Sequence, residues 1–261
     1  MASPKKTRLD LLLFECGLAE SRAQAQRLIM AGRVRVDGQV VLKPASRVDP
    51  GVTLTLDPGP RFVSRGGEKL EAALEAFRVD VRGRVCADVG ASTGGFTDCL
   101  LQHGAARVYA IDVGKGILHW KLRRDPRVVV MEETNARYLE SLPEAVSLVT
   151  VDASFISLKV LLPVVKGWGE GEIIALIKPQ FEAGRAEVSR GKGVVRDPEI
   201  HRRVLREVLT FAREEGLRLQ GLIRSPLLGP KGNVEFLAWW GLQGDEMDVE
   251  AAVNAVIGEK E

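Results

Sequence analysis

The 261-residue sequence predicts an α/β protein in which a small α+β domain precedes a doubly wound, largely parallel sheet. Two patterns predict this fold class. From residue 85 onward, apolar runs of strand length alternate with helical patterns, as in parallel sheets that helices cover on both faces. Before residue 58, two helical patterns precede a hairpin signal and one more short strand pattern. We therefore expect domains at 1–58 and 66–261, joined by a linker at 59–65.

The first domain is expected to contain two helices and a small hairpin sheet. Apolar residues recur at helical spacing over 9–16, and Gly17 marks the end of that helix. Ser21 and Gln24 have the spacing of a capping box, which predicts the start of a second helix. Asp37-Gly38 lies between two short β-rich runs and predicts a tight hairpin turn. Because so short a segment has a marginal core, we expect the domain to depend on its neighbour or its ligand.

Charge is distributed unevenly along the chain. Residues 1–60 contain nine Lys or Arg and six Asp or Glu, whereas the remaining residues contain 28 Lys or Arg and 29 Asp or Glu. A basic front domain indicates a polyanionic partner, although a solvated surface would account for the same modest excess.

The segment SRAQAQRLIMAGRVRVDGQVV, at 21–41, resembles the RNA-binding module of ribosomal small-subunit protein four and of pseudouridine synthases. The Ser-Arg cap, the Gly between helix and strand and the Val-Asp-Gly turn carry the resemblance, which covers residues 8–56. It implies that the partner is RNA. The basic residues that it assigns to RNA phosphates are Arg8, Arg22, Arg27, Arg33, Arg35 and Lys43.

A glycine-rich turn, DVGASTGGFTD at 88–98, opens the second domain's sheet. We expect a strand at 85–89, a helix to about His103 and a second strand at 107–111 that ends in Asp112. The spacing does not fit the G-x-G-x-x-G of a nicotinamide site, and the G-K-[ST] of a phosphate-binding loop is absent. A cofactor without phosphates, S-adenosylmethionine, fits better, with Asp112 placed to bind its ribose. An unrelated tight turn is the alternative.

The expected cofactor site is built from this turn and from the polar residues that follow the neighbouring strands. It comprises Asp88, Gly90, Ala91, Ser92, Gly94, Gly95, Phe96, Asp112, Val113, Asn135 and Asp152. Asn135 is expected near the adenine. Phe96, which directly follows the double glycine, is also a candidate for the core.

Further strands are predicted at 127–131, 145–152 and 172–178, with helices at 158–165 and 198–216. Together they give a Rossmann-like sheet. The last two apolar runs, 217–225 and 234–240, have no helix between them, so we expect an antiparallel pair at the edge of the sheet. Trp239 and Trp240 are neighbours on a strand and should therefore face opposite sides of the sheet.

The segment 182–198 is rich in Gly and charged residues. We expect either a solvated loop or a lid that contacts RNA through Arg185, Arg190 and Lys192.

Ligands of open α/β sheets bind at the carboxyl ends of the strands, where Asp152 and Lys178 are expected. Methylation of a cytosine carbon would require a cysteine there, and none follows Cys99. The Asn/Asp-Pro-Pro-aromatic turn of base-amine methyltransferases is replaced by DASF at 152–155. A hydroxyl acceptor served by a lysine remains. Each polar residue also has a structural interpretation, as a cap, a surface charge or an ion-pair partner.

Six segments, in this order, resemble the TlyA family, also called hemolysin A: SRGGEKL, DVGASTGGFTD, DPRVVVMEETNAR, VDASFISL, LIKPQFEAG and SPLLGPKGNVEF. The resemblance covers about residues 7–240. These proteins are FtsJ-like ribose methyltransferases that modify cytidine 2′-hydroxyls of ribosomal RNA, in one or both subunits. The resemblance implies a catalytic tetrad at Lys69, Asp152, Lys178 and Glu235, with Lys178 as the base. It also implies S-adenosylmethionine as cofactor and ribosomal subunits as partners.

The remaining features indicate a cytoplasmic monomer without a metal. There is no cationic leader, and the uncharged apolar stretches are far shorter than the ~20 residues that span a bilayer. The three cysteines and three histidines are not at metal-binding spacing, and the cysteines are expected as reduced thiols. Two alternatives stay open: a membrane-active hemolysin-like protein, suggested only by the family's second name, and a non-catalytic RNA-binding factor.

Overall fold

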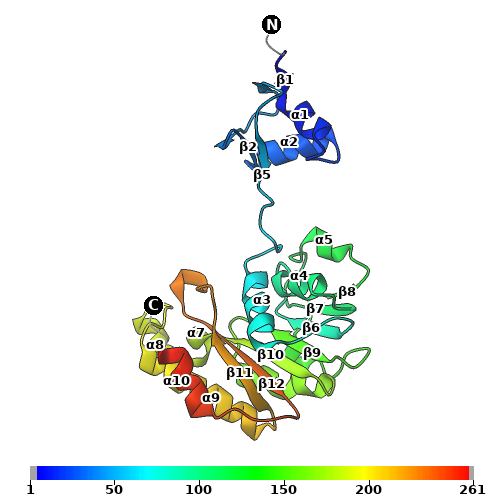
Figure 1. Cartoon of the computed structure of the whole chain (residues 1–261). Helices are drawn as coiled ribbons and strands as arrows, with labels where there is room; N and C mark the ends of the chain where they lie inside the picture. The colour runs from blue at the N-terminus through cyan, green and yellow to red at the C-terminus, as the bar shows by residue number, and fades with distance from the viewer. Residues whose placement is uncertain (1–4, 259–261) are drawn as a thin grey trace. The chain divides into compact units, whose positions relative to one another are not determined.

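The computed structural model describes residues 5–258, apart from the side chains of Arg185, Ala186 and Arg190. The chain forms two compact units, Met1–Arg61 and Phe62–Glu261, shown in Figure 1. The second half of the expected linker differs from the prediction, because Phe62 is buried and the Val63 N–H donates to the Asp98 carboxylate at 2.9 Å. Residues 62–65 therefore pack as part of the second unit.

The first unit contains two helices and two small antiparallel sheets, with strand orders β1-β4 and β3-β2-β5. Its elements are β1 (Thr7–Arg8), α1 (Leu9–Glu15), α2 (Arg22–Met30), β2 (Val34–Val36), β3 (Gln39–Val40), β4 (Arg47–Val48) and β5 (Leu54–Leu56). The two helices and β2 enclose a small core, in which the buried apolar residues are Leu9, Leu13, Ala19, Ala25, Ile29 and Val34.

Local sequence chemistry explains these boundaries. Ser21 Oγ accepts the Gln24 N–H at 3.2 Å and so caps α2, as predicted. The Gln24 side chain reaches back to the N–H of Glu20 instead of that of Ser21. Asp37 and Gly38 both have positive φ, at 48° and 82°, which is the conformation of a type I′ hairpin turn. The predicted hairpin between β2 and β3 is thus confirmed.

The second unit is built on a seven-stranded sheet in the order β11-β12-β10-β9-β6-β7-β8. Its strands are β6 (Val85–Val89), β7 (Arg107–Ile111), β8 (Val128–Met131), β9 (Leu148–Val151), β10 (Glu172–Ile177), β11 (Arg218–Arg224) and β12 (Phe236–Gly241). Within this sheet β12 runs opposite to the other six strands, so it pairs antiparallel with both β10 and β11. The expected antiparallel pair at one edge is confirmed, with β12 inserted between β10 and β11.

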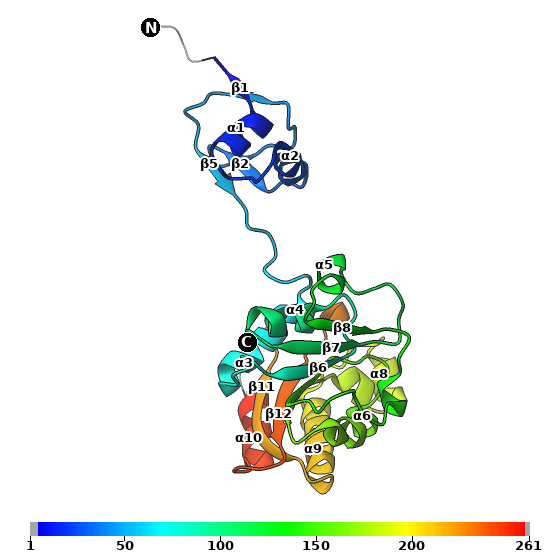
Figure 2. The same cartoon turned by 90° about the vertical axis from the view of Figure 1, so that its right-hand side faces the viewer.

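Helices cover both faces of this sheet (Figure 2). The side chains on the two sides of the sheet belong to different hydrophobic cores. One face packs against α3 (Gly66–Phe77), α4 (Gly95–Gln102) and α5 (Trp120–Arg123). The other face packs against α6 (Leu158–Val165), α9 (Pro198–Glu214) and α10 (Val249–Gly258). The doubly wound α/β fold class is therefore confirmed.

The two adjacent tryptophans of β12 illustrate this division. Trp240 is fully buried in the core that contains α9, whereas the Trp239 ring stacks on Phe77 of α3, with centroids 5.7 Å apart. The opposite orientation of the two side chains is as predicted.

Some elements were not expected from the sequence. The helix α7 (Pro179–Glu182) ends where the segment 182–198 begins, and the segment itself contains a short helix, α8 (Arg185–Arg190), so it is not simply a solvated loop. The helices α5 and α10 were also missed. Three 3-10 turns complete the unit: η1 (Ala136–Tyr138), η2 (Lys166–Trp168) and η3 (Pro230–Gly232). Across residues 5–258, no helix has the length and apolarity that crossing a membrane would require.

Candidate active site

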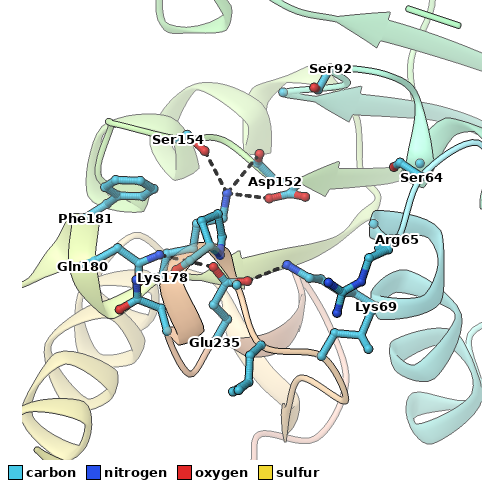
Figure 3. A pocket seen from close by; sticks show the side chains of 18 of the residues that line it. Ser64, Arg65, Lys69, Ser92, Asp152, Ser154, Lys178, Gln180, Phe181 and Glu235 are labelled. Carbon is cyan, nitrogen blue, oxygen red and sulfur yellow. Dashed lines mark hydrogen bonds and ion pairs between the residues drawn. The ribbon is translucent and has the colours of Figure 1, made fainter. Parts of the chain in front are cut away.

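A cavity of about 920 Å³ opens at the carboxyl ends of β6, β9 and β10. Lys69 on α3, Asp152 after β9 and Lys178 after β10 all line it. Glu235 joins them because β12 is antiparallel to β10, with Phe236 opposite Ile177, so the start of β12 lies at the end of β10. The structure thus brings together the four residues that the resemblance assigned to catalysis (Figure 3).

Lys178 forms the first of two ion pairs in this cavity. Its Nζ lies 2.6 Å from Asp152 Oδ1, and it donates to Ala153 O at 3.0 Å and to Ser154 Oγ at 3.1 Å. The Lys178 side chain is only 8% exposed. Each of its three N–H groups therefore has an acceptor, so the ammonium is held in one orientation.

Lys69 and Glu235 form the second ion pair, with Nζ 2.6 Å from Oε2. Glu235 has no exposed surface, and its Oε1 accepts a hydrogen bond from Gln180 Nε2 at 3.2 Å. Gly229 packs directly against this carboxylate, where a Cβ would overlap it. The glycine leaves room for Glu235 to reach Lys69. Figure 3 shows the two ion pairs beside each other.

The glycine turn after β6 borders the same cavity. Gly90 has a φ of 81°, and a Cβ there would lie 2.8 Å from the carbonyl oxygen of Asp152, so this close approach requires glycine. Ser92 also has positive φ, and its N–H donates to Asp112 Oδ2 at 2.8 Å. Asp112 Oδ1 accepts the Gly114 N–H at 2.8 Å. The carboxylate at the end of β7 thus fixes the turn.

A second cavity, of about 500 Å³, lies on the other side of this turn and is lined by Asp112, Val113 and Asn135. It shares five lining residues with the first cavity: Gly90, Ser92, Asp152, Ser154 and Phe155. Apolar walls with a carboxylate at a strand end fit an adenosine, because Asp112 can accept ribose hydroxyls. The donor set and the glycine cradle therefore fit S-adenosylmethionine.

The other residues expected to bind the cofactor divide into two groups. Ala91, Gly95 and Phe96 line the first cavity, although Phe96 is also buried in the core. Asp88 and Gly94 line neither cavity. At Gly94, a Cβ would overlap Leu122, so this glycine serves the packing of the α5 segment instead.

Asp88 is fully buried, and its carboxylate accepts hydrogen bonds from Thr97 Oγ1 at 2.6 Å and Thr150 Oγ1 at 3.2 Å. Burial raises the pKa of Asp88 to about 7. The carboxylate of Asp88 therefore joins β6 to α4 and β9, and its expected contact with the cofactor stays a prediction.

Sequence reasoning missed several residues of the site. Ser154 accepts from Lys178, and Phe155 is 91% exposed with a φ of 64°. The Phe155 and Phe181 rings lie 4.9 Å apart, between centroids, at the mouth of the cavity. Each of these residues follows Asp152 or Lys178 by no more than three positions, so proximity in sequence to a catalytic candidate was the available signal.

Glu182, also missed, connects the two segments that carry these residues. It accepts the Ser157 Oγ–H at 2.6 Å and the Leu158 N–H at 2.7 Å, and so caps α6 from α7. Burial raises the pKa of Glu182.

The six basic residues that were expected to bind RNA differ in their surroundings in the first unit. Asp10 is fully buried, and its carboxylate lies 3.0 Å from the guanidinium groups of both Arg8 and Arg22. Gln26 Nε2 donates to the same carboxylate at 2.7 Å. The hydrogen bond from Arg8 is the main reason why the pKa of Asp10 lies below its usual range. Arg8 and Arg22 are therefore counter-ions of a buried acid.

Arg33 is half-buried and donates to Asp57 O at 2.9 Å. Arg27, Arg35 and Lys43 are exposed, as is Arg22 despite its ion pair with Asp10. In the second unit, Lys192 is exposed, while the side chains of Arg185 and Arg190 lie outside the described part of the structure.

Two further expectations concern metals and thiols. In the described part of the chain, no group of His, Cys, Asp and Glu has the arrangement of a metal site. Cys86 and Cys99 are buried thiols outside any disulfide, and Cys16 is an exposed one.

The sheet order, the single antiparallel strand and the glycine turn define a Rossmann-like methyltransferase. Residues 62–242 match the FtsJ-like methyltransferase family, and residues 7–54 match the S4 domain. The chain belongs to the FtsJ-like methyltransferases and carries an S4 domain ahead of the catalytic unit.

Particular relatives narrow the assignment. The chain is 48% identical to the 16S/23S rRNA (cytidine-2′-O)-methyltransferase TlyA of Mycobacterium tuberculosis, over 98% of each chain. It is 42% identical to Hemolysin A of Brachyspira hyodysenteriae, over 88% of this chain and 98% of the relative. A solved structure from Streptococcus thermophilus, named as a candidate hemolysin, is 44% identical, with a TM-score of 0.73 over 98% of this chain and 96% of that one. The resemblance to the TlyA family is therefore confirmed.

Proposed function

We propose that this protein transfers a methyl group from S-adenosylmethionine to the 2′-hydroxyl of a cytidine in ribosomal RNA. The observation that carries the proposal is the pair of Lys–carboxylate ion pairs that line one cavity beside the glycine turn. The name of the Mycobacterium tuberculosis relative supports the choice of cytidine and of ribosomal RNA. One chain supplies all four side chains, so a monomer suffices, and ribosomal subunits as substrate imply a cytoplasmic reaction.

The second cavity and the glycine turn are the proposed cofactor site. Asp112 accepts the ribose hydroxyls, while Val113 and Asn135 flank the adenine. When bound, S-adenosylmethionine supplies an electrophilic methyl group. The chain's own task is to hold the acceptor oxygen in line with that group, and positioning of this kind lowers the barrier by several kcal/mol, on the order of 7–11 kcal/mol in the most favourable cases.

Lys178 is the proposed general base. A ribose hydroxyl is a poor nucleophile, so removal of its proton as the new bond forms accelerates transfer. Lys178 can accept that proton only in its neutral form, and the ammonium that results is then stabilised by Asp152, Ala153 and Ser154. Lys69, fixed by Glu235, places a second positive charge in the cavity, where it stabilises negative charge developing on the acceptor oxygen.

The S4 domain is proposed to bind the RNA, with its exposed cations Arg27, Arg35 and Lys43 in contact with phosphates. Arg8 and Arg22 neutralise the buried Asp10, and their guanidinium groups remain partly exposed. We therefore propose that both residues stabilise the domain and also contact RNA phosphates.

The test is incubation of the purified protein with labelled S-adenosylmethionine and separate small and large ribosomal subunits. Digestion and mass spectrometry should recover the label as 2′-O-methylcytidine, and the digested fragments should identify the nucleotide. Recovery of the label only on a base or on a ribosomal protein would overturn the proposal. Cofactor binding without transfer to either subunit would instead support a non-catalytic RNA-binding factor. Dye release from lipid vesicles, which we expect to be absent, tests the hemolysin alternative.

A further inference from the structure

Trp120 is unusually exposed for its residue type. Its relative exposure is 64%, whereas Trp168 and Trp240 are buried. The ring of Trp239, as described above, packs on α3. A large ring on the surface points to a ligand only if its neighbours do so as well, because scattered apolar residues are common on protein surfaces.

The neighbours of Trp120 are cationic. Residues 113–127 contain five Lys or Arg and one Asp, although the chain from residue 61 onward carries a slight excess of acidic residues. Carboxylates already neutralise three of these cations: Glu133 pairs with Lys115, Glu132 with Arg123 and Asp125 with Arg127.

Two cations remain beside the indole. Arg124 has no carboxylate partner in the described part of the chain, and its Cζ lies 5.5 Å from the centroid of the Trp120 ring. Lys121 is 59% exposed and only loosely paired, with its Nζ 3.6 Å from Asp98. An exposed aromatic ring flanked by one cation without a carboxylate partner and one that is only loosely paired is complementary to nucleic acid, since bases stack on rings and phosphates pair with cations.

The position of this segment relates it to the active site. Val113 and Ile117 line the second cavity. The His119 N–H donates to the carbonyl of Thr93, which lines the first cavity, at 3.1 Å. Trp120 follows directly, on a segment that the buried Leu122 anchors against the glycine turn. Trp120 therefore lies in a segment whose other residues border the second cavity and contact the wall of the first.

We propose that Trp120, Lys121 and Arg124 form an RNA-binding surface on the methyltransferase unit, distinct from the S4 domain. A base of the substrate RNA stacks on the open face of the indole, and the two cations bind adjacent phosphates. This inference rests on the proposed function and deepens it: the catalytic unit itself holds the RNA strand next to the nucleotide that enters the cavity.

The experiment compares full-length variants for binding of ribosomal RNA at several salt concentrations. Trp120→Ala should weaken binding about 10-fold, which lies within the range for loss of one base–aromatic stack, without changing the salt dependence. Trp120→Phe should restore part of the affinity. The double variant Lys121→Ala/Arg124→Ala should reduce the slope of log affinity against log salt by about 1.5, because two phosphate contacts are lost.

Lys115→Ala is the matched control, since it removes a cation of the same segment that Glu133 already neutralises. It should leave RNA affinity within twofold of the wild type. All variants should bind S-adenosylmethionine as the wild type does, and methylation should show a raised KM for RNA with little change in kcat.

An RNA affinity of Trp120→Ala within twofold of the wild type would overturn the inference, as would an equal loss of S-adenosylmethionine affinity, which would assign the ring to the cofactor pocket. The proposed function fails separately: if the wild type methylates no ribosomal RNA, the binding comparison still decides whether this surface contacts RNA.

Discussion

The Nζ atom of Lys69 lies 2.6 Å from Oε2 of Glu235, although the two residues are 166 positions apart in sequence. Lys69 belongs to the first helix of the methyltransferase unit, and Glu235 precedes its last strand. The pair therefore joins the beginning and the end of this unit at the wall of the cavity.

Replacing Glu235 tests whether this ion pair serves the reaction. Glu235→Gln keeps the shape of the side chain but leaves the nearly buried Lys69 without its counter-ion. We expect methyl transfer to fall at least 100-fold and the free energy of unfolding to fall by about 2 kcal/mol, since unpaired buried charges are costly. Glu68→Gln, an exposed change on the same helix, is the control. Near-normal kcat for Glu235→Gln would remove the residue from the proposed mechanism.

Lys178 provides a second prediction. Lys178→Ala should abolish transfer while S-adenosylmethionine affinity stays within a few-fold, because the side chain faces the acceptor cavity and not the adenosine cavity. Isothermal titration and single-turnover assays measure the two quantities separately. Lys159→Ala, which removes a surface lysine paired with Glu207, should change neither. Parallel loss of transfer and cofactor binding would show that Lys178 is structural.

The role of Glu182 as a positioning residue gives a third prediction. Glu182→Leu removes both hydrogen bonds to the start of α6 and should release the segment that carries Ser154 and Phe155. We expect a 10-fold or larger loss of kcat at unchanged cofactor affinity. Glu182→Gln should recover much of it, since an amide oxygen can still accept the Leu158 N–H. If Glu182→Gln and Glu182→Leu were equally impaired, hydrogen bonding to this segment would not explain the loss.

Arg22 and Arg35 separate structural from RNA-binding cations in the S4 domain. Arg35 is exposed without a carboxylate partner in the described residues, so Arg35→Ala should weaken RNA binding and lower the salt slope by about 0.8, with no loss of stability. Arg22→Ala leaves the buried Asp10 with fewer donors, so it should also speed hydrogen exchange throughout this domain. Equal hydrogen-exchange rates in the two variants would contradict a structural role of Arg22.

The sequence was sufficient for the strands and the glycine turn because their signals are local. Continuous apolar runs gave β6 and β7 with their observed boundaries, and Asp37-Gly38 gave the hairpin. It was not sufficient for the short helices α5 and α8, whose four and six residues are too few to show a helical period. These helices depend on tertiary contacts, such as the packing of Leu122 against Gly94.

The residues of the site can likewise be divided into those with a local sequence signal and those that depend on tertiary structure. Strand ends place Asp152 and Lys178 by a general rule of open sheets. The pairing of Lys69 with Glu235 depends on the position of β12 next to β10, which no local pattern encodes, and it was reached through the family resemblance. Asp10 was missed because a buried acid on a short helix has the same sequence pattern as an exposed one. The sequence alone did not reveal the buried contacts of Asp88, because a strand-end carboxylate can bind hydroxyls of its own chain as well as those of a ligand, as Thr97 and Thr150 show.

Asp88 leads to a prediction about pH. Burial raises its pKa to about 7 from 3.8, so between these pH values the folded state retains a proton that the unfolded state has released. The free energy of unfolding should therefore fall as pH rises through this window, by up to about 4 kcal/mol, and level off above pH 7. The amide that Asp88→Asn introduces cannot titrate, so the free energy of unfolding of this variant should not decrease in this way as pH rises. All four tryptophans lie in the second unit, so tryptophan fluorescence in urea at pH 5 and pH 8 reports its unfolding. The exposed Asp245→Asn is the control, and an Asp88→Asn variant that kept the wild-type difference between the two pH values would show that Asp88 does not take up the proton.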